Sequence, residues 1–151
     1  MSSQPQPFDR QAAERQLRTL EPLLGTWRIG GDAPGTVTYQ WADMGGWIIQ
    51  HVELDSEDGP TRGVEYIGYD TETSTLRSYY FSGTGELLRY TYRLDGTTLS
   101  IFFGDETSPA KYVGTFDPDF TSSTGGWQWP GGGYQTTMTR IDGGDHHSGR
   151  V

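Results

Sequence analysis

His51 is the side chain of this sequence best suited to proton transfer. Its unperturbed pKa lies near neutrality, and no other histidine precedes residue 146. Glu53 follows two residues later, so both side chains would lie on the same face of a strand. If that face is turned inward, His51 could act as a general base or orient a polar group of a ligand. A histidine on the outer face, or one satisfied by a neighbouring hydroxyl, is the alternative interpretation.

Other signals of enzyme chemistry are weaker. His146 and His147 with Asp145 could bind a metal ion, but a polar tail flanked by glycine is more typical of solvated chain. The sequence has no cysteine, which excludes disulfides, thiolate metal sites and cysteine catalysis. It also has no zinc-ligand spacing, nucleophile elbow, phosphate loop or dinucleotide fingerprint. We therefore expect no cofactor and no metal ion.

The tyrosines are more informative as a group. A buried tyrosine hydroxyl needs a hydrogen-bond partner, whereas a barrel filled completely would more easily use Leu, Ile and Val. A tyrosine-rich interior therefore favours a cavity for a flat or partly polar organic ligand, and a large aromatic core is the alternative. The tyrosines expected on the inner face are Tyr39, Tyr66, Tyr80, Tyr90, Tyr92, Tyr112 and Tyr134.

These residues lead to two main hypotheses about function. The first is a module that binds a small hydrophobic or aromatic molecule inside a barrel. The second is a cofactor-free cyclase or isomerase, in which His51 or a tyrosine moves a proton in the same cavity. A structural or interaction protein is a third possibility. The predicted cavity lining is Tyr39, Trp41, Trp47, Ile49, His51, Tyr66, Tyr80, Tyr90, Tyr92, Ile101, Phe103 and Tyr112.

Composition restricts the partners and the location. The chain has 151 residues and a formal net charge of -9, so nucleic acids and anionic membrane surfaces would repel it. The N-terminal residues have neither a basic start nor an apolar run of signal-peptide length, and no segment approaches the roughly 20 apolar residues of a membrane helix. We expect a cytoplasmic protein that binds a small molecule, with its oligomeric state left open.

A short amphipathic helix is expected before the first strand. Asp9 can cap it, and Pro22 disfavours a helical Glu21 and so ends it. Such a helix must dock its apolar side against another element, and the open end of the β structure is the obvious partner. The apolar stripe consists of Ala13, Leu17, Leu20 and Leu24.

Ten strands with turn residues between them are expected after the helix. This pattern is typical of an antiparallel barrel or sandwich without βαβ units. We predict a single all-β domain over residues 8–141, with a disordered lead (1–7) and a disordered tail (142–151). The strands are expected near residues 25–30, 36–41, 47–54, 63–69, 75–81, 87–94, 98–103, 111–116, 122–129 and 134–141.

Two hairpins predict which residues share a face. A two-residue turn at Asp95-Gly96 would pair Leu94–Thr97, Tyr92–Leu99, Tyr90–Ile101 and Leu88–Phe103, and a turn over 130–133 would pair Trp129–Tyr134 and Trp127–Thr136. Both place the large apolar side chains on the inner face. Phe102, on the outer face, has no explanation at this level.

The sequence does not fix the register of a third hairpin, which is expected around the loop 42–46. If Trp41 and Trp47 pair across the loop 42–46, then one face carries Val37, Tyr39, Trp41, Trp47, Ile49, His51 and Glu53. A five-residue loop does not fix the pairing, and a slip by one residue exchanges the two faces of a strand. The inward direction of His51 depends on this register.

A Gly25-x-Trp27 motif after a short helix, together with Arg140 on the last strand, resembles the structural signature of the calycins, which include lipocalins and fatty-acid-binding proteins. The resemblance implies that Arg140 packs over Trp27 and closes one end of the barrel, a cation–π contact, so that both residues are structural. An arginine free to clamp an anionic ligand would instead have to point into the cavity.

Residues from about 17 to 141 are more specifically similar to small, largely uncharacterised bacterial lipocalin-like domains. The matching motifs are Leu20-x-x-Leu-Leu-Gly-Thr-Trp, Gly45-Gly46 before a strand and Gly68-Tyr69-Asp70 at the end of a later one. Ten strands also resemble nitrobindin-type haem barrels. Those supply an axial histidine close to the last strand, a position that His146 and His147 do not match, so haem is not expected.

Overall fold

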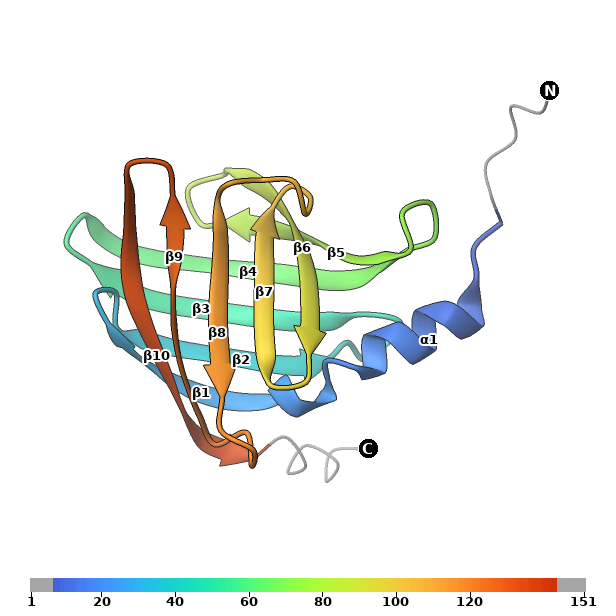
Figure 1. The fold of residues 1–151 in the computed structure, drawn as a ribbon, viewed down its shortest axis with the longest axis horizontal. Helices are drawn as coiled ribbons and strands as arrows, with labels where there is room; N and C mark the ends of the chain where they lie inside the picture. Colours follow the sequence, from blue (N-terminus) through green and yellow to red (C-terminus); the bar gives the residue numbers. More distant parts are fainter. Residues whose placement is uncertain (1–6, 144–151) are drawn as a thin grey trace.

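The computed structural model describes residues 7–143 as a closed antiparallel barrel with one short N-terminal helix (Figure 1). Each strand pairs with its neighbours in sequence, and the first pairs with the last. The predicted all-β, calycin-like architecture is confirmed. The strands are β1 Gly25–Gly31, β2 Gly35–Trp41, β3 Ile48–Ser56, β4 Gly59–Asp70, β5 Thr75–Ser82, β6 Leu87–Asp95, β7 Thr98–Phe103, β8 Lys111–Phe116, β9 Ser122–Trp129 and β10 Gly132–Gly143.

The helix α1 (Arg10–Arg18) lies across one end of the barrel, on the right in Figure 1, and a 3-10 turn, η1 (Glu21–Leu23), follows it. Asp9 caps it as expected, because its carboxylate accepts a hydrogen bond from the Ala12 backbone N–H at 3.0 Å. Ala12, and not the predicted Ala13, is the buried alanine. Among residues 7–143, no helix has the length and apolarity needed to cross a membrane.

Arg140 and Trp27 lie at the same end of the barrel. The Arg140 guanidinium carbon lies 4.2 Å from the Trp27 ring centroid, and the Trp27 indole N–H donates to the Leu23 carbonyl at 2.8 Å. Arg140 also donates to the Leu24 and Pro22 carbonyls, both at 2.6 Å, and to the Phe120 carbonyl at 2.9 Å. The guanidinium therefore ties the chain after α1 to β10, as the resemblance implied, and is held away from the barrel interior.

Both hairpin turns lie one residue away from the predicted positions. Leu94 pairs with Leu99 instead of Thr97, and Trp127 pairs with Tyr134 instead of Thr136. In the first turn Gly96 has a φ of 62°, as expected for glycine at the first central position of a type II′ turn. Moving a turn by one residue shifts each pairing by two, so the predicted inner faces are preserved.

The register of the β2–β3 hairpin differs from the prediction, and the difference changes which side chains of β3 face inward. Trp41 pairs with Ile48, and not with Trp47, because the loop closes with the Ala42 N–H donating to the Trp47 carbonyl at 2.9 Å. The slip of one residue turns the predicted face of β3 outward. The residues of β3 that belong to the buried or cavity-lining set are Ile48, Gln50, Val52 and Leu54.

The outer face of β6 and β7 is partly covered, which explains Phe102. The Arg93 guanidinium lies 5.4 Å from the Phe102 ring centroid and pairs with Glu106 of the β7–β8 loop at 2.9 Å. The Thr91 hydroxyl donates to the Gly104 carbonyl at 2.6 Å. This loop and Arg93 therefore shield an apolar side chain that the alternation of the strand places outside.

Candidate ligand cavity

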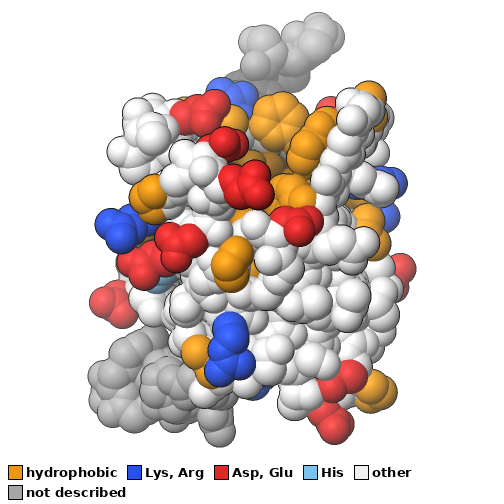
Figure 2. All heavy atoms as spheres, turned by 90° about the vertical axis from the view of Figure 1, so that its left-hand side faces the viewer, with side chains coloured by type: hydrophobic (Ala, Val, Ile, Leu, Met, Phe, Trp, Pro, Cys, Tyr) orange, Lys and Arg blue, Asp and Glu red, His pale blue; other side chains and the backbone are white. Residues whose placement is uncertain are grey.

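A cavity of about 720 Å³ occupies the barrel between an apolar core and the end opposite α1. Its lining reaches the surface at Ala33, Pro60, Thr84 and Trp129, which belong to the connections or strand ends at that end. Figure 2 views the molecule from the left-hand side of Figure 1, where apolar side chains are visible in a hollow beside acidic ones. The volume lies within the range of about 300–1,000 Å³ that is typical of small-molecule sites.

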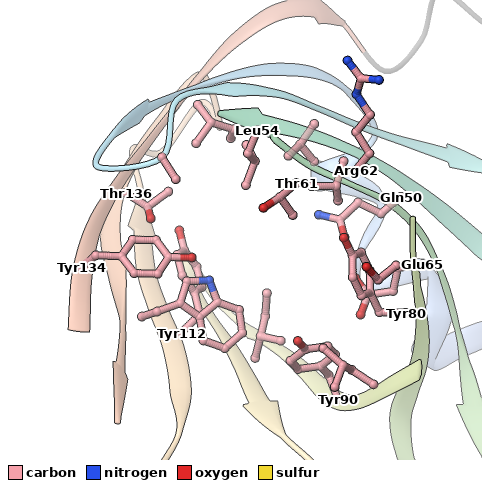
Figure 3. Close-up of a pocket in the computed structure, with 18 of the residues that line it drawn as sticks. Gln50, Leu54, Thr61, Arg62, Glu65, Tyr80, Tyr90, Tyr112, Tyr134 and Thr136 are labelled. Carbon is pink, nitrogen blue, oxygen red and sulfur yellow. The ribbon is translucent and has the colours of Figure 1, made fainter. Parts of the chain in front are cut away.

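Aromatic rings form much of the wall (Figure 3). Trp127 contacts Tyr90 and Tyr112, with ring centroids 5.7 and 5.8 Å apart, respectively. Tyr134 projects into the cavity from β10. Aliphatic side chains complete the wall, among them Ile29, Val37, Leu99 and Ile101. The wall thus offers flat apolar surfaces together with phenol hydroxyls.

Glu65 is the principal polar group of the cavity, and sequence reasoning missed it. The side chain comes from β4 and is only 3% exposed. Its carboxyl group accepts a hydrogen bond from the Tyr92 hydroxyl at 2.8 Å and another from the Ser78 hydroxyl. Ser78 comes from the adjacent strand β5, and Tyr92 comes from β6, the strand beyond it. Two hydroxyl groups therefore hold the carboxyl group in place, and no Lys, Arg or His among the described residues forms an ion pair with it.

Two further buried polar side chains lie beside Glu65: Gln50 on β3 and Tyr39 on β2. The Gln50 side-chain amide donates to the Tyr39 hydroxyl at 2.9 Å, and both side chains are buried. Gln50 pairs with Glu65 across β3 and β4. We call Tyr39, Gln50, Glu65, Ser78 and Tyr92 the Glu65 cluster.

The Glu65 cluster forms the inner end of the cavity. Two residues further toward α1 on β3, β4 and β5, the inward positions are apolar and buried. These positions are Ile48, Ile67 and Leu76, and they pack in the core together with leucines of the helical segment. A ligand that enters from the open end would therefore meet aromatic walls first and the carboxyl group last.

Burial dominates the electrostatics of this cluster. It raises the pKa of Glu65 to about 7, although the hydrogen bonds from Ser78 and Tyr92 act in the opposite direction. Burial, followed by the charge of Glu65, raises the pKa of Tyr39, Tyr92 and Tyr90 above the usual tyrosine range. Glu65 therefore changes charge near neutral pH while the surrounding phenols stay protonated.

Tyr80 faces Glu65 across β4 and β5. Its hydroxyl oxygen is buried and has no hydrogen-bond partner among the described residues. The ring lies over Gly63, where an added Cβ would come within 2.3 Å of the phenol. Glycine at position 63 therefore makes room for a phenol at the edge of the cavity.

No protein-family model matches this chain, and no curated protein matches it. The functional assignment therefore depends on the cavity and its chemistry.

The structure places half of the predicted lining residues in the cavity. Those that line it are Tyr39, Tyr80, Tyr90, Tyr92, Ile101 and Tyr112. Trp41 is partly buried and packs against the apolar core instead of lining the cavity. Phe103 is 46% exposed at the rim of the barrel and contacts Tyr90 edge-on, with ring centroids 5.8 Å apart.

Four residues of the β2–β3 loop, β3 and β4 that were predicted to line the cavity lie on the outer face instead, so these predictions were wrong. Trp47, Ile49, His51 and Tyr66 do not line the cavity, because of the register slip in the β2–β3 hairpin and its continuation through β4. Trp47, Tyr66 and Phe81 instead form an aromatic row, with successive ring centroids 6.4 and 6.3 Å apart. Gly68 leaves space for the Trp47 ring on this face.

His51 is exposed on the outer face of β3 and pairs with Thr38 and Val64 on its neighbours. The proton-transfer mechanism that required an inward His51 therefore does not apply. His146 and His147, for which the sequence favours solvated chain over metal binding, lie outside the described residues. Within residues 7–143, no group of three or more His, Asp or Glu side chains is arranged to hold a metal ion.

The sequence marks Glu65 as unusual but does not give its direction. In the segment Val64-Glu65-Tyr66-Ile67-Gly68, a single carboxylate interrupts a run of strand-forming apolar residues. A charged residue on a strand most often faces solvent, and only the pairing of β4 with β3 and β5 shows that this one faces inward.

Proposed function

We propose that this protein binds a small organic molecule with a flat or apolar body and one polar group inside its barrel. The observation that carries the proposal is a cavity of about 720 Å³ with aromatic walls, open at one end and closed inside by the Glu65 cluster. The Trp27–Arg140 closure supports a further proposal, that the chain is a member of the calycin superfamily.

The chemistry of the lining supports a binder. Flat rings such as Trp127 and Tyr90 can stack on an aromatic or alicyclic ligand, and apolar area removed from water stabilises the complex by about 25 cal/mol per Å². The Glu65 cluster supplies hydrogen-bonding groups that fix the orientation of the ligand.

Tryptophan fluorescence tests the proposal, since Trp127 lines the cavity and Trp47 lies on the outer face. We expect saturable quenching by members of a set of two-ring aromatic compounds. The double variant Trp127→Phe/Trp129→Phe should remove most of the quenching signal, because both side chains line the cavity, and Trp47→Phe should preserve it. Absence of saturable quenching throughout the set, confirmed by calorimetry, would contradict a binding function.

A second candidate function is a cofactor-free isomerase or cyclase acting in the same cavity. The observation that favours it is Glu65, a buried carboxyl group with a pKa of about 7 beside the Tyr92 hydroxyl. A base with this pKa can remove a proton from a bound substrate at neutral pH. In this version Glu65 takes the role that the sequence suggested for His51.

Hydrogen exchange separates the two functions. Each compound found by fluorescence is incubated with the protein in D₂O, and deuterium at carbon is measured by mass spectrometry. Incorporation that is lost in Glu65→Gln and kept in His51→Ala would favour the enzyme. Binding without deuterium incorporation would favour the binder.

A further inference from the structure

The cavity has an uneven charge distribution. Its charged lining residues are Arg62, Glu65 and Glu86, and Glu65 is the one charged residue that is buried within residues 7–141. Arg62 is exposed, and Figure 3 shows its guanidinium directed away from the cavity. A ligand carboxylate at the inner end would thus meet Glu65, and no basic side chain of the lining is directed toward it.

The open end carries the same sign of charge. Five connections lie at this end, over residues 32–34, 57–58, 83–86, 104–110 and 130–131, and none contains Lys or Arg. Their acidic residues are Asp32, Glu57, Asp58, Glu86, Asp105 and Glu106. Figure 2 shows acidic side chains next to apolar ones on this face. Together with the net charge of -9, this arrangement attracts cations and repels anions.

We propose that the ligand is a small amphipathic amine, whose ammonium group pairs with Glu65 while its apolar body lies against Trp127 and the cavity tyrosines. This inference rests on the proposed binding function and specifies the chemical class of the ligand. It excludes fatty-acid carboxylates as the preferred ligands of this barrel.

The geometry around Glu65 suits an ammonium group. Each carboxylate oxygen receives one hydrogen bond, from Tyr92 or from Ser78, and each can accept a second. The titratable groups around it are the phenols of Tyr39, Tyr80, Tyr90 and Tyr92, whose pKa values burial raises, so they remain neutral. Tyrosine and tryptophan faces also attract cations.

An ammonium group would also supply the missing positive partner of a buried carboxylate. Pairing favours the charged form of Glu65, so amine binding near pH 6.5 should release a proton from this group. A neutral ligand would leave the proton in place. Proton release on binding therefore reports the pairing without any substitution in the protein.

The test uses three probes that share one ring system: 1-naphthylmethylamine, 1-naphthylmethanol and 1-naphthoic acid. Isothermal titration calorimetry at pH 7 measures their affinities for the wild type, Glu65→Gln and Glu53→Gln. The Glu53 side chain is exposed on the outer face of β3, so Glu53→Gln removes the same charge outside the cavity. Titrations at pH 6.5 in two buffers of different ionisation enthalpy measure proton release.

We expect the amine to bind about tenfold or more tightly than the alcohol, because charge-assisted hydrogen bonds exceed neutral ones by this order. The preference should disappear in Glu65→Gln and persist in Glu53→Gln, and amine binding alone should release a proton. Equal affinity for amine and alcohol, tighter binding of the acid, or no proton release would overturn the amine inference while the binding function stands. If none of the three probes binds, and the wider fluorescence set also fails, the binding function itself is wrong.

Discussion

Glu65, the group that the proposals place against the ligand, destabilises the folded state when it is ionised. Its carboxyl group is buried and accepts hydrogen bonds from the hydroxyl groups of Ser78 and Tyr92. Burial raises its pKa from 4.5 to about 7, which corresponds to about 3 kcal/mol of folding free energy at pH values above both. Under the two proposed functions, this carboxyl group would bind the ligand or transfer a proton.

Replacing Glu65 by Gln should therefore change how stability depends on pH. The folded pKa is raised, so the unfolded state loses its proton first as pH rises. Stability is highest below the unfolded pKa and falls between about pH 4.5 and 7. The variant lacks this loss, so its free energy of unfolding relative to the wild type should rise by about 3 kcal/mol from pH 4 to pH 8. Urea unfolding at several pH values measures this difference, and parallel pH profiles would contradict the buried ionisation.

The register of β3 decides which side chains of this strand face the cavity. A slip of one residue places Gln50 in the cavity and His51 on the surface. In the hairpins with two-residue turns, moving the turn by one residue shifts each pairing by two. The same side chains therefore still face the barrel interior.

His51→Ala should consequently have little effect. We expect the free energy of unfolding to change by no more than about 0.5 kcal/mol, as for other exposed substitutions, and probe affinity to remain within about twofold. Thermal unfolding and calorimetry check both values, with Gln50→Ala on the inner face as the comparison. A large loss of affinity in His51→Ala would show that β3 has the other register.

The closed end depends on the contact between β10 and the segment after α1. Arg140 spans this junction through its hydrogen bonds to the Pro22, Leu24 and Phe120 carbonyls and through the Trp27 ring. A lysine has a single ammonium group and cannot reproduce the planar fork.

Arg140→Lys should lower the free energy of unfolding by about 2–3 kcal/mol, since carbonyl oxygens near the closed end lose their donors. Arg28→Lys serves as the control, because Arg28 is exposed on β1. Chemical unfolding of both variants gives the comparison. Equal stability of Arg140→Lys and Arg28→Lys would mean that the guanidinium does not hold this end together.

The whole molecule combines a negative net charge with acidic connections around the open end. Fields of this kind act over about 8–10 Å at moderate ionic strength and are screened by salt. They affect the approach of a charged ligand much more than that of a neutral one.

The affinity for 1-naphthylmethylamine should therefore fall by about threefold or more between low and high salt, whereas that for 1-naphthylmethanol should hardly change. Calorimetry at two sodium chloride concentrations measures both. The double variant Glu57→Gln/Asp58→Asn, at the β3–β4 turn, should reduce the salt effect for the amine. An identical salt dependence for both probes would argue against steering by the acidic end.

The sequence by itself determined the strands, the capped helix and the closing pair of Trp27 and Arg140. These features follow from local patterns: alternation with a period of two, turn residues and a short motif at each end of the chain. It also placed Tyr90 and Tyr92 in the cavity, because a one-residue move of the two-residue turn between β6 and β7 preserves the strand faces. The tertiary structure alone decided the direction of β3 and the place of Glu65. A five-residue loop does not fix register, and the environment of a carboxylate is set by neighbouring strands, which closure of the barrel brings around it.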